Sequence, residues 1–128
     1  MNIQELQWVK RENIPVKMIV MNYEALGMIR HLQRDYFDCV YADTSDGSGF
    51  SSCDFTDVAQ AYGIPAKRIQ GEDVDKYAGG FLEQNGPELL EIMLEHGTYA
   101  YPKTCLGEPN PIQQPYLPKP IFDELMEL

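Results

Sequence analysis

The acidic side chains between residues 38 and 54 are the first candidates for chemistry, because carboxylates are common ligands of calcium. Asp43, Asp46 and Asp54 lie in or next to a stretch rich in Asp, Ser and Gly. Their spacing does not match the D-x-D-x-D-G loop with its distal Glu. We therefore expect an exposed and mobile acidic loop over residues 38–52, and not a calcium site.

His31 and the serines near residue 50 are the next candidates, for proton transfer and nucleophilic attack. His31 lies in the sequence Arg-His-Leu-Gln-Arg and could carry a proton near neutral pH. No nucleophile motif accompanies it, so we prefer a position on the surface of a helix. Residues 47–51, Gly-Ser-Gly-Phe-Ser, are no nucleophile elbow, because they do not join a strong strand to a helix. A small-molecule hydrolase therefore has little support.

A polar turn at residues 22–25 follows an apolar run at residues 16–21. The turn could face a cofactor, or it could be an ordinary connection from strand to helix, where polar residues are favoured whatever the function. Residues 26–28, Leu-Gly-Met, could line the same site or belong to the core, since Met often fills irregular gaps. The residues by themselves favour the ordinary connection and the core.

Composition limits the classes of partner. The chain has 20 acidic and 10 basic residues, a formal net charge of −10, and its few bases are scattered. Nucleic acid and anionic membranes are therefore poor partners, because both require clustered Lys and Arg. With 128 residues, 44% hydrophobic residues and eight tyrosines, the chain is expected to fold as one domain.

The cysteines and the N-terminus indicate a soluble cytoplasmic protein. Cys39, Cys53 and Cys105 are far apart and form no C-x-x-C pair, so ordinary reduced thiols are expected. The N-terminus lacks the basic and apolar regions of a signal peptide. No window approaches the roughly 20 apolar residues of a membrane span.

The hydrophobic pattern predicts a doubly wound α/β fold. Asn2 and Glu5 form a capping-box pattern that predicts the first helix. The apolar run at residues 16–21 predicts an interior strand that is covered on both faces. The expected helices lie at residues 2–13, 25–36, 54–63 and 74–82, and the expected strands at residues 16–21, 66–69 and 89–94. This order predicts a three-layer, Rossmann-like, mostly parallel sheet with helices on both faces.

The last part of the chain, residues 101–128, is predicted to be a proline-rich arm or lid. Its six prolines exclude a regular helix before residues 121–126. We expect it to complete a single domain whose residues 1–100 form the α/β part.

Four segments, in order, resemble the C-terminal, cofactor-binding domain of acetolactate synthase and related thiamine-diphosphate-dependent enzymes. They are residues 1–7 with 13–20, residues 26–33, residues 54–64 and residues 86–92. The resemblance extends from residue 1 to about residue 94 without large shifts in spacing. It implies a partial thiamine-diphosphate-binding domain, truncated at its N-terminal side.

The resemblance also implies a set of cofactor and metal positions. In the family the diphosphate is bound through Mg²⁺, which prefers hard oxygen ligands. The corresponding positions are Asn22, Tyr23 and the backbone carbonyl of Ala25. The family's Gly-Asp-Gly, which supplies an aspartate ligand, is absent from these residues, and its ligand asparagine is replaced by Tyr23. A phenol with an ordinary pKa near 10 is a poor Mg²⁺ ligand.

The resemblance further places Leu26, Gly27 and Met28 in the pocket on the thiazolium side of the cofactor. It implies a parent enzyme that acts on 2-oxo acids, by decarboxylation or by transfer of the acyl unit, and that needs thiamine diphosphate and Mg²⁺. The catalytic glutamate of the family lies in a separate N-terminal domain, so no catalytic residue is assigned here.

We expect this chain to be inactive alone. We also expect it to associate, either with itself, as a dimer or larger species, or with the N-terminal domains that these residues lack. A sheet with open edges invites such pairing. The alternative is a non-catalytic α/β module that keeps the fold and binds a protein partner, and Tyr23 is its main support.

Overall fold

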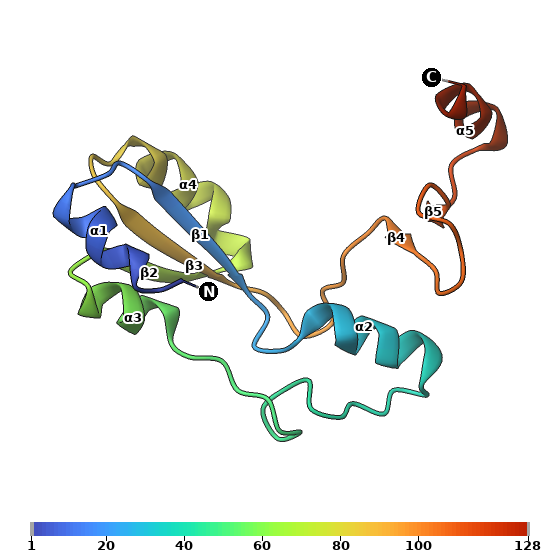
Figure 1. Cartoon of the computed structure of the whole chain (residues 1–128), viewed down its shortest axis with the longest axis horizontal. Helices are drawn as coiled ribbons and strands as arrows, with labels where there is room; N and C mark the ends of the chain where they lie inside the picture. The colour runs from blue at the N-terminus through green and yellow to red at the C-terminus, as the bar shows by residue number, and fades with distance from the viewer. Residues whose placement is uncertain (1, 128) are drawn as a thin grey trace. The chain divides into compact units, whose positions relative to one another are not determined.

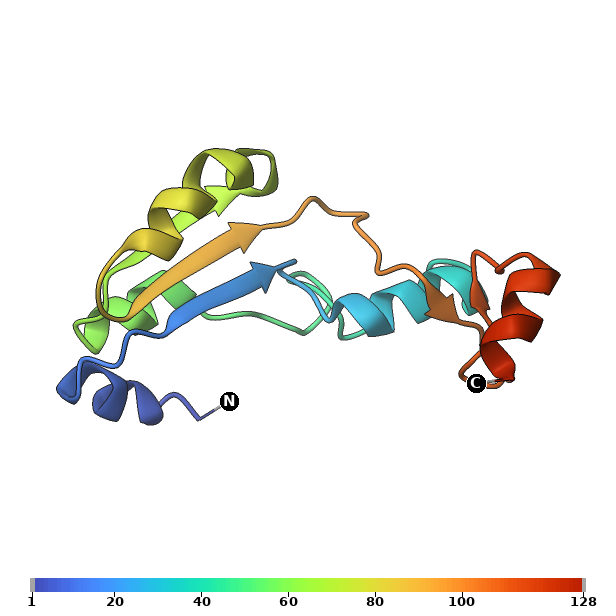
Figure 2. The same cartoon turned by 90° about the horizontal axis from the view of Figure 1, so that it is seen from above.

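The computed structural model describes residues 2–127 and divides the chain into two compact units, Met1–Thr98 and Tyr99–Leu128. The first unit contains a parallel sheet of strands β1 (Lys17–Asn22), β2 (Ala66–Gln70) and β3 (Glu88–Met93), in the order β1-β3-β2. All three strands run in the same direction, as the arrows in Figures 1 and 2 show. The central strand is therefore β3, the last of the three in the sequence.

Helices cover both faces of this sheet (Figure 2). Helices α1 (Glu5–Arg11) and α3 (Phe55–Ala61) lie on one face, where Ala59, Ile64 and Leu89 form a buried cluster with side chains of both helices. The 3₁₀ turn η1 (Gly71–Asp73) leads into helix α4 (Val74–Glu83) on the other face. That face has its own cluster, which consists of Ile69, Phe81, Leu90 and Ile92. The predicted α/β class, with a parallel sheet between helices, is confirmed.

Strand β1 differs from its prediction as an interior strand that is covered on both faces. Within the described residues β1 is an edge strand of the sheet. Met18 and Val20 pack on the α1/α3 face, but Ile19 is 52% exposed and Met21 is 58% exposed. The register places these two beside Leu90 and Ile92 of β3, which belong to the cluster with Phe81 of α4. Helix α4 thus covers the apolar face of β3 and leaves that of β1 open.

The ends of two helices also differ from the prediction. The capping box is wrong, because α1 begins at Glu5 after Gln4, and Asn2 contributes its backbone carbonyl to the amide of Glu5 at 3.1 Å. Helix α2 (Gly27–Tyr36) begins two residues later than expected, because Ala25 forms an isolated bridge with Ser45. Helix α3 lies where it was expected, and its N-cap is Asp54, which accepts a hydrogen bond from the amide of Asp57.

The second unit contains two short antiparallel strands, β4 (Lys103–Thr104) and β5 (Gln113–Gln114), and helix α5 (Lys119–Met126). Helix α5 begins two residues before the predicted start, because a proline is tolerated in the first turn of a helix and Pro120 lies there. Among residues 2–127 no helix combines the length and the apolar character that crossing a bilayer requires.

Candidate functional site

The carboxyl ends of the three parallel strands meet at one edge of the sheet. The register aligns Asn22 of β1 with Met93 of β3, and Met93 with Gln70 of β2. In open α/β sheets, ligands bind beyond this edge. The polar turn at residues 22–25, which joins β1 to α2, lies here.

Asn22 is held inside the protein by both ends of its side-chain amide. Asn22 is only 6% exposed. Its Nδ2 donates to Oε1 of Glu91 at 2.6 Å, and its Oδ1 accepts from the backbone amide of Glu24 at 2.8 Å. Glu24 has φ +53°, a left-handed conformation that is strained for a residue other than glycine. The amide of Asn22 therefore stabilises a tight turn immediately after the strand.

Glu91 connects that turn to the neighbouring strand β2. The residue is fully buried, and its Oε2 accepts a hydrogen bond from Nε of Arg68 at 2.8 Å. Nη2 of Arg68 lies 2.7 Å from Oδ2 of Asp54, the N-cap of α3. Hydrogen bonds to Glu91 and then to Asp54 raise the pKa of Arg68, which keeps it charged. Asn22, Glu91, Arg68 and Asp54 thus form one chain of polar contacts, which we call the Glu91 network.

Asp54 is the exposed end of the Glu91 network. Its Oδ1 accepts from Oγ1 of Thr56 at 2.6 Å and from the amide of Asp57 at 2.9 Å. These two hydrogen bonds, with the guanidinium of Arg68 as a further cause, lower the pKa of Asp54 to about 2. The carboxylate is therefore ionised over the whole neutral range.

Tyr23 ties the end of β1 to the segment that follows β3. The residue is buried, and its phenol oxygen accepts a hydrogen bond from the backbone amide of Gly97 at 2.7 Å. The ring of His96 meets the Tyr23 ring edge-on, with the centroids 5.9 Å apart. Gly27 approaches the same ring closely, because a Cβ at this position would lie 3.4 Å from Cδ1 of Tyr23. Tyr23 thus packs between the start of α2 and the turn at residues 96–97.

Helix α2 exposes apolar side chains and buries a polar one. Met28 is 71% exposed and Leu26 is also exposed, so the expected core position of these two residues is wrong. His31 is buried, and its Nε2 lies 3.4 Å from Oδ2 of Asp35, one turn along the helix. The prediction of a surface position for His31 is therefore also wrong. The loop after α2 folds back on the start of this helix, where the amide of Leu26 donates to the carbonyl of Thr44.

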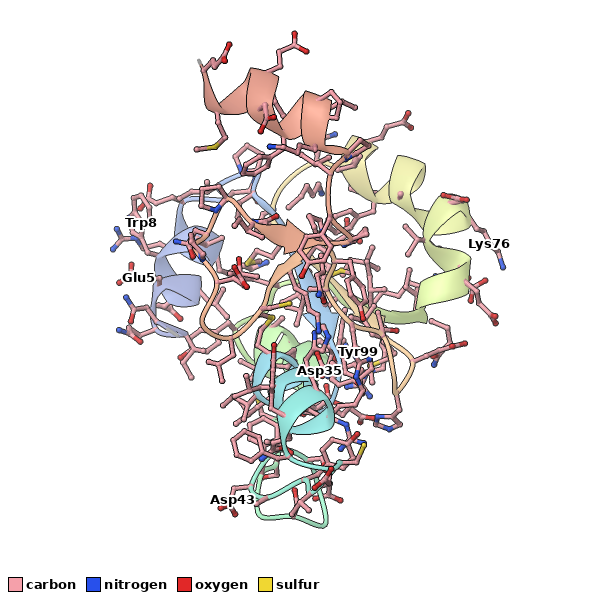
Figure 3. The ribbon with its side chains drawn as sticks, turned by 90° about the vertical axis from the view of Figure 1, so that its right-hand side faces the viewer. Glu5, Trp8, Asp35, Asp43, Lys76 and Tyr99 are labelled. Atoms are coloured by element: carbon pink, nitrogen blue, oxygen red, sulfur yellow. The ribbon has the colours of Figure 1, made fainter. Side chains whose placement is uncertain are left out.

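A polar hollow of about 720 Å³ lies beside this turn, with walls from the turn, from α2, from the loop after α2 and from the segment after β3. Its lining residues are Glu24, Arg30, Ser45, Asp46, Ser51, Ser52 and His96. The loop is ordered locally by Ser48, whose hydroxyl accepts from the amides of Thr44 and Ser45. The acidic side chains of Asp43 and Asp46 are exposed, as predicted, and Figure 3 labels Asp43 on this loop.

Comparison with known proteins identifies the family. The model of the "Thiamine pyrophosphate enzyme, C-terminal TPP binding domain" matches residues 1–92, which is more than half of the chain. The chain belongs to this family. The resemblance to thiamine-diphosphate-dependent enzymes that the sequence predicted is confirmed.

Individual relatives of this TPP-binding domain are acetolactate synthases. "Acetolactate synthase 2, chloroplastic" of Zea mays is 34% identical over 112 residues, which are 84% of this chain and 18% of the relative. "Acetolactate synthase isozyme 2 large subunit" of Escherichia coli (strain K12) is 32% identical over 111 residues, 86% of this chain and 20% of the relative. "Probable acetolactate synthase 2, chloroplastic" of Oryza sativa subsp. japonica is 33% identical over 109 residues, 80% of this chain and 16% of the relative. The chain therefore spans a fifth or less of the length of these relatives.

The residues of this TPP-binding domain do not by themselves fit a magnesium site. The side-chain oxygens of Asn22 and Tyr23 each accept a backbone amide hydrogen, so a cation at either oxygen would compete with the hydrogen bond that holds the turn. The third expected position, Ala25, offers only its backbone carbonyl. Within residues 2–127 no group of three or more His, Cys, Asp or Glu side chains is arranged to hold a metal ion. Asn22 and Tyr23 instead stabilise the turn through hydrogen bonds.

The Glu91 network was not predicted, although the sequence contains one signal for it. Glu91 interrupts an apolar run, Leu89-Leu-Glu-Ile-Met, that was correctly predicted to be a strand. A charged residue in a buried strand requires a partner, because an isolated buried carboxylate costs far more free energy than a paired one. Arg68, which lies in a weak strand with an exposed pattern, is the cation that could have been predicted as the partner of Glu91.

Proposed function

We propose that this chain forms the C-terminal part of the thiamine-diphosphate-binding domain of an acetolactate-synthase-like enzyme that acts on 2-oxo acids. The reaction would be a decarboxylation or the transfer of the resulting acyl unit to a second carbonyl. The observation that carries the proposal is the turn at residues 22–25, which lies at the carboxyl edge of the parallel sheet in a chain that belongs to the TPP-binding family. In this class of enzyme the cofactor stabilises the carbanion, and the protein binds and orients it.

The contribution that we propose for this chain is to position the turn and α2 beside the cofactor. Asn22 and Tyr23 hold the turn from two sides, through Glu91 of β3 and through the amide of Gly97. Leu26 and Met28 remain exposed and so are available to contact the thiazolium side of a bound cofactor. Metal ligands for the diphosphate would come chiefly from residues outside this chain. We therefore expect the isolated chain to be inactive.

Association with the rest of such an enzyme, or with a second copy of the chain, is part of the proposal. Strand β1 is an edge strand among the described residues, and Ile19 and Met21 expose apolar surface beside it. An open edge and an apolar face favour the addition of further structure.

Isothermal titration calorimetry tests the cofactor proposal. The full-length natural protein is titrated with thiamine diphosphate in the presence of Mg²⁺, and pyruvate consumption is measured in parallel. We expect binding and turnover by the full-length protein, and no turnover by the 128-residue chain. A folded full-length protein that shows neither heat of binding nor turnover would overturn the proposal.

A second candidate is a non-catalytic α/β module that binds a protein partner. It is favoured by one observation, that the oxygens of Asn22 and Tyr23 are both used to hold the backbone. The substitution Tyr23→Asn in the full-length protein separates the two candidates. It should strengthen Mg²⁺-dependent cofactor binding if the protein is an enzyme, and it should change nothing but stability if the protein is a module.

A further inference from the structure

Arg30 of α2 is a cation without an anionic partner. Among the described residues it makes no ion pair, and its only hydrogen bond is from Nη1 to Oγ of Ser45, at a long 3.4 Å. Its Nε is buried and has no hydrogen-bond partner. A buried donor that is left unpaired costs about 1–3 kcal/mol, so native proteins rarely retain one without a reason. The charge of this guanidinium has no anionic partner in the described part of the chain, so its terminal nitrogens are a candidate binding group.

The plane of this guanidinium is fixed before any ligand arrives. Its Cζ lies 3.9 Å from the centroid of the Tyr41 ring, which is the geometry of a cation stacked on an aromatic face. Nε is buried and closed to a ligand, whereas Nη1, with only a long hydrogen bond to Ser45, and Nη2 form the terminal edge of the guanidinium. Two parallel N–H groups on one edge match the two oxygens of a carboxylate.

The edge belongs to a residue that lines the polar hollow. Other donors line the same hollow, from the hydroxyl groups of Ser51 and Ser52 and the ring of His96. The hollow is also lined by two carboxylates, of Glu24 and Asp46, and both of these residues are exposed. Solvent and salt screen the repulsion between these exposed charges and an anion. That repulsion grows with the charge of the anion, so it is smaller for a singly charged anion than for a doubly charged one.

We propose that Arg30 binds the carboxylate of a small monoanionic acid in this hollow, through Nη1 and Nη2. The identity of the acid as a 2-oxo acid rests on the proposed function, whereas the carboxylate site does not. The two acidic residues select against phosphate and other dianions. No covalent step is involved, since Arg30 only orients the acid.

Nuclear magnetic resonance of the arginine side chains tests this site in the 128-residue chain. The chain has four arginines, and the Nε–H signal of Arg30 is assigned by its loss in Arg30→Gln. Pyruvate, acetate and phosphate are titrated separately into the tens of millimolar range. We expect the Arg30 signal to shift saturably with pyruvate and with acetate, and less with phosphate. No shift with pyruvate in the folded chain, or tighter binding of phosphate than of pyruvate, overturns the proposal.

Matched variants separate the site from a general charge effect. Arg34→Gln removes a cation of the same helix that is already paired with Asp35, and it should leave pyruvate binding unchanged. Arg30→Lys keeps the charge but loses the fork, and should weaken binding about tenfold. Asp46→Asn removes a repelling charge, and should strengthen binding about two- to fivefold at low salt. If Arg34→Gln weakens binding as much as Arg30→Lys does, the site is wrong.

The outcome is independent of the enzymatic proposal. Pyruvate turnover by the full-length protein reports on the proposed function, and the Arg30 signal reports on the carboxylate site. If the protein shows no turnover but its Arg30 signal responds to pyruvate, the carboxylate site stands and the proposed function is wrong. If the protein shows turnover but its Arg30 signal does not respond, the proposed function stands and the carboxylate site is wrong.

Discussion

Nδ2 of Asn22 lies 2.6 Å from Oε1 of Glu91, a hydrogen bond between residues that are 69 positions apart in the chain. Arg68 donates to the other carboxylate oxygen of Glu91. Glu91 on the central strand thus receives one donor from each of its two neighbouring strands, at the level where β1 ends and the turn begins. Removing this carboxylate should therefore affect both neighbours.

Glu91→Ala should destabilise the protein by about 2–4 kcal/mol, because it leaves a buried amide and part of a guanidinium without their acceptor. Urea denaturation measures the change. Glu91→Gln should recover part of the loss, since its amide oxygen can accept from only one of the two donors. Glu88→Ala on the same strand, whose carboxylate is partly exposed and pairs with Lys17, should cost less than about 1 kcal/mol. Equal losses at positions 88 and 91 would show that the network has no special role.

Tyr23→Phe should cost about 1 kcal/mol, because the backbone amide of Gly97 loses its acceptor while the ring still packs. Hydrogen exchange of the Gly97 amide should become faster. Tyr116→Phe, at an exposed position, should change stability by less than about 0.5 kcal/mol. An unchanged exchange rate at Gly97 would mean that the phenol does not hold this segment.

Acid should weaken the protein through Asp54. The pKa of this carboxyl is lowered from 3.8 to about 2 in the folded protein, so its contribution to stability is fully present above pH 3.8. As the pH falls from about 4 through about 2, that contribution is lost. The difference in thermal midpoint between the natural protein and Asp54→Asn should therefore shrink over this interval. A difference that stays constant from pH 5 to pH 2 would contradict the assignment.

The open face of β1 should control self-association. Replacing Ile19 and Met21 together by Ser removes the apolar surface beside the edge strand, and should shift the chain toward monomer in sedimentation equilibrium. The exposed side chain of Leu82 on α4 provides the control, because Leu82→Ser removes exposed apolar surface from a helix and leaves the face of β1 unchanged. Equal effects of both variants would indicate nonspecific association.

The parts of the fold that were predictable depend on neighbours in the sequence. Helix α3 was located to within two residues at each end, since Asp54 caps its start and Gly63, with φ +73°, follows its end. The position of β1 in the sheet was not predictable, because an apolar run reads the same whether its strand is covered on one face or on two.

The candidate site was likewise predictable only in those features that depend on neighbours in the sequence. The turn at residues 22–25 was located from its break in the apolar pattern, and it does lie at the carboxyl edge of the sheet. The contacts that its side chains make were not predictable, because their partners, Glu91 and Gly97, are far away in the sequence.

The Glu91 network also specifies how the strands align. Parallel strands have no hairpin to set their alignment, and an apolar ladder tolerates a slip that keeps each side chain on its face. A slip that moved Asn22 two residues beyond Met93 would carry it about 7 Å farther from the Glu91 carboxylate, out of hydrogen-bond reach. Arg68 would still pair with Oε2 of Glu91, but Oε1 would be buried without a donor, so the contact with Asn22 favours the native alignment of β1 over this slipped one.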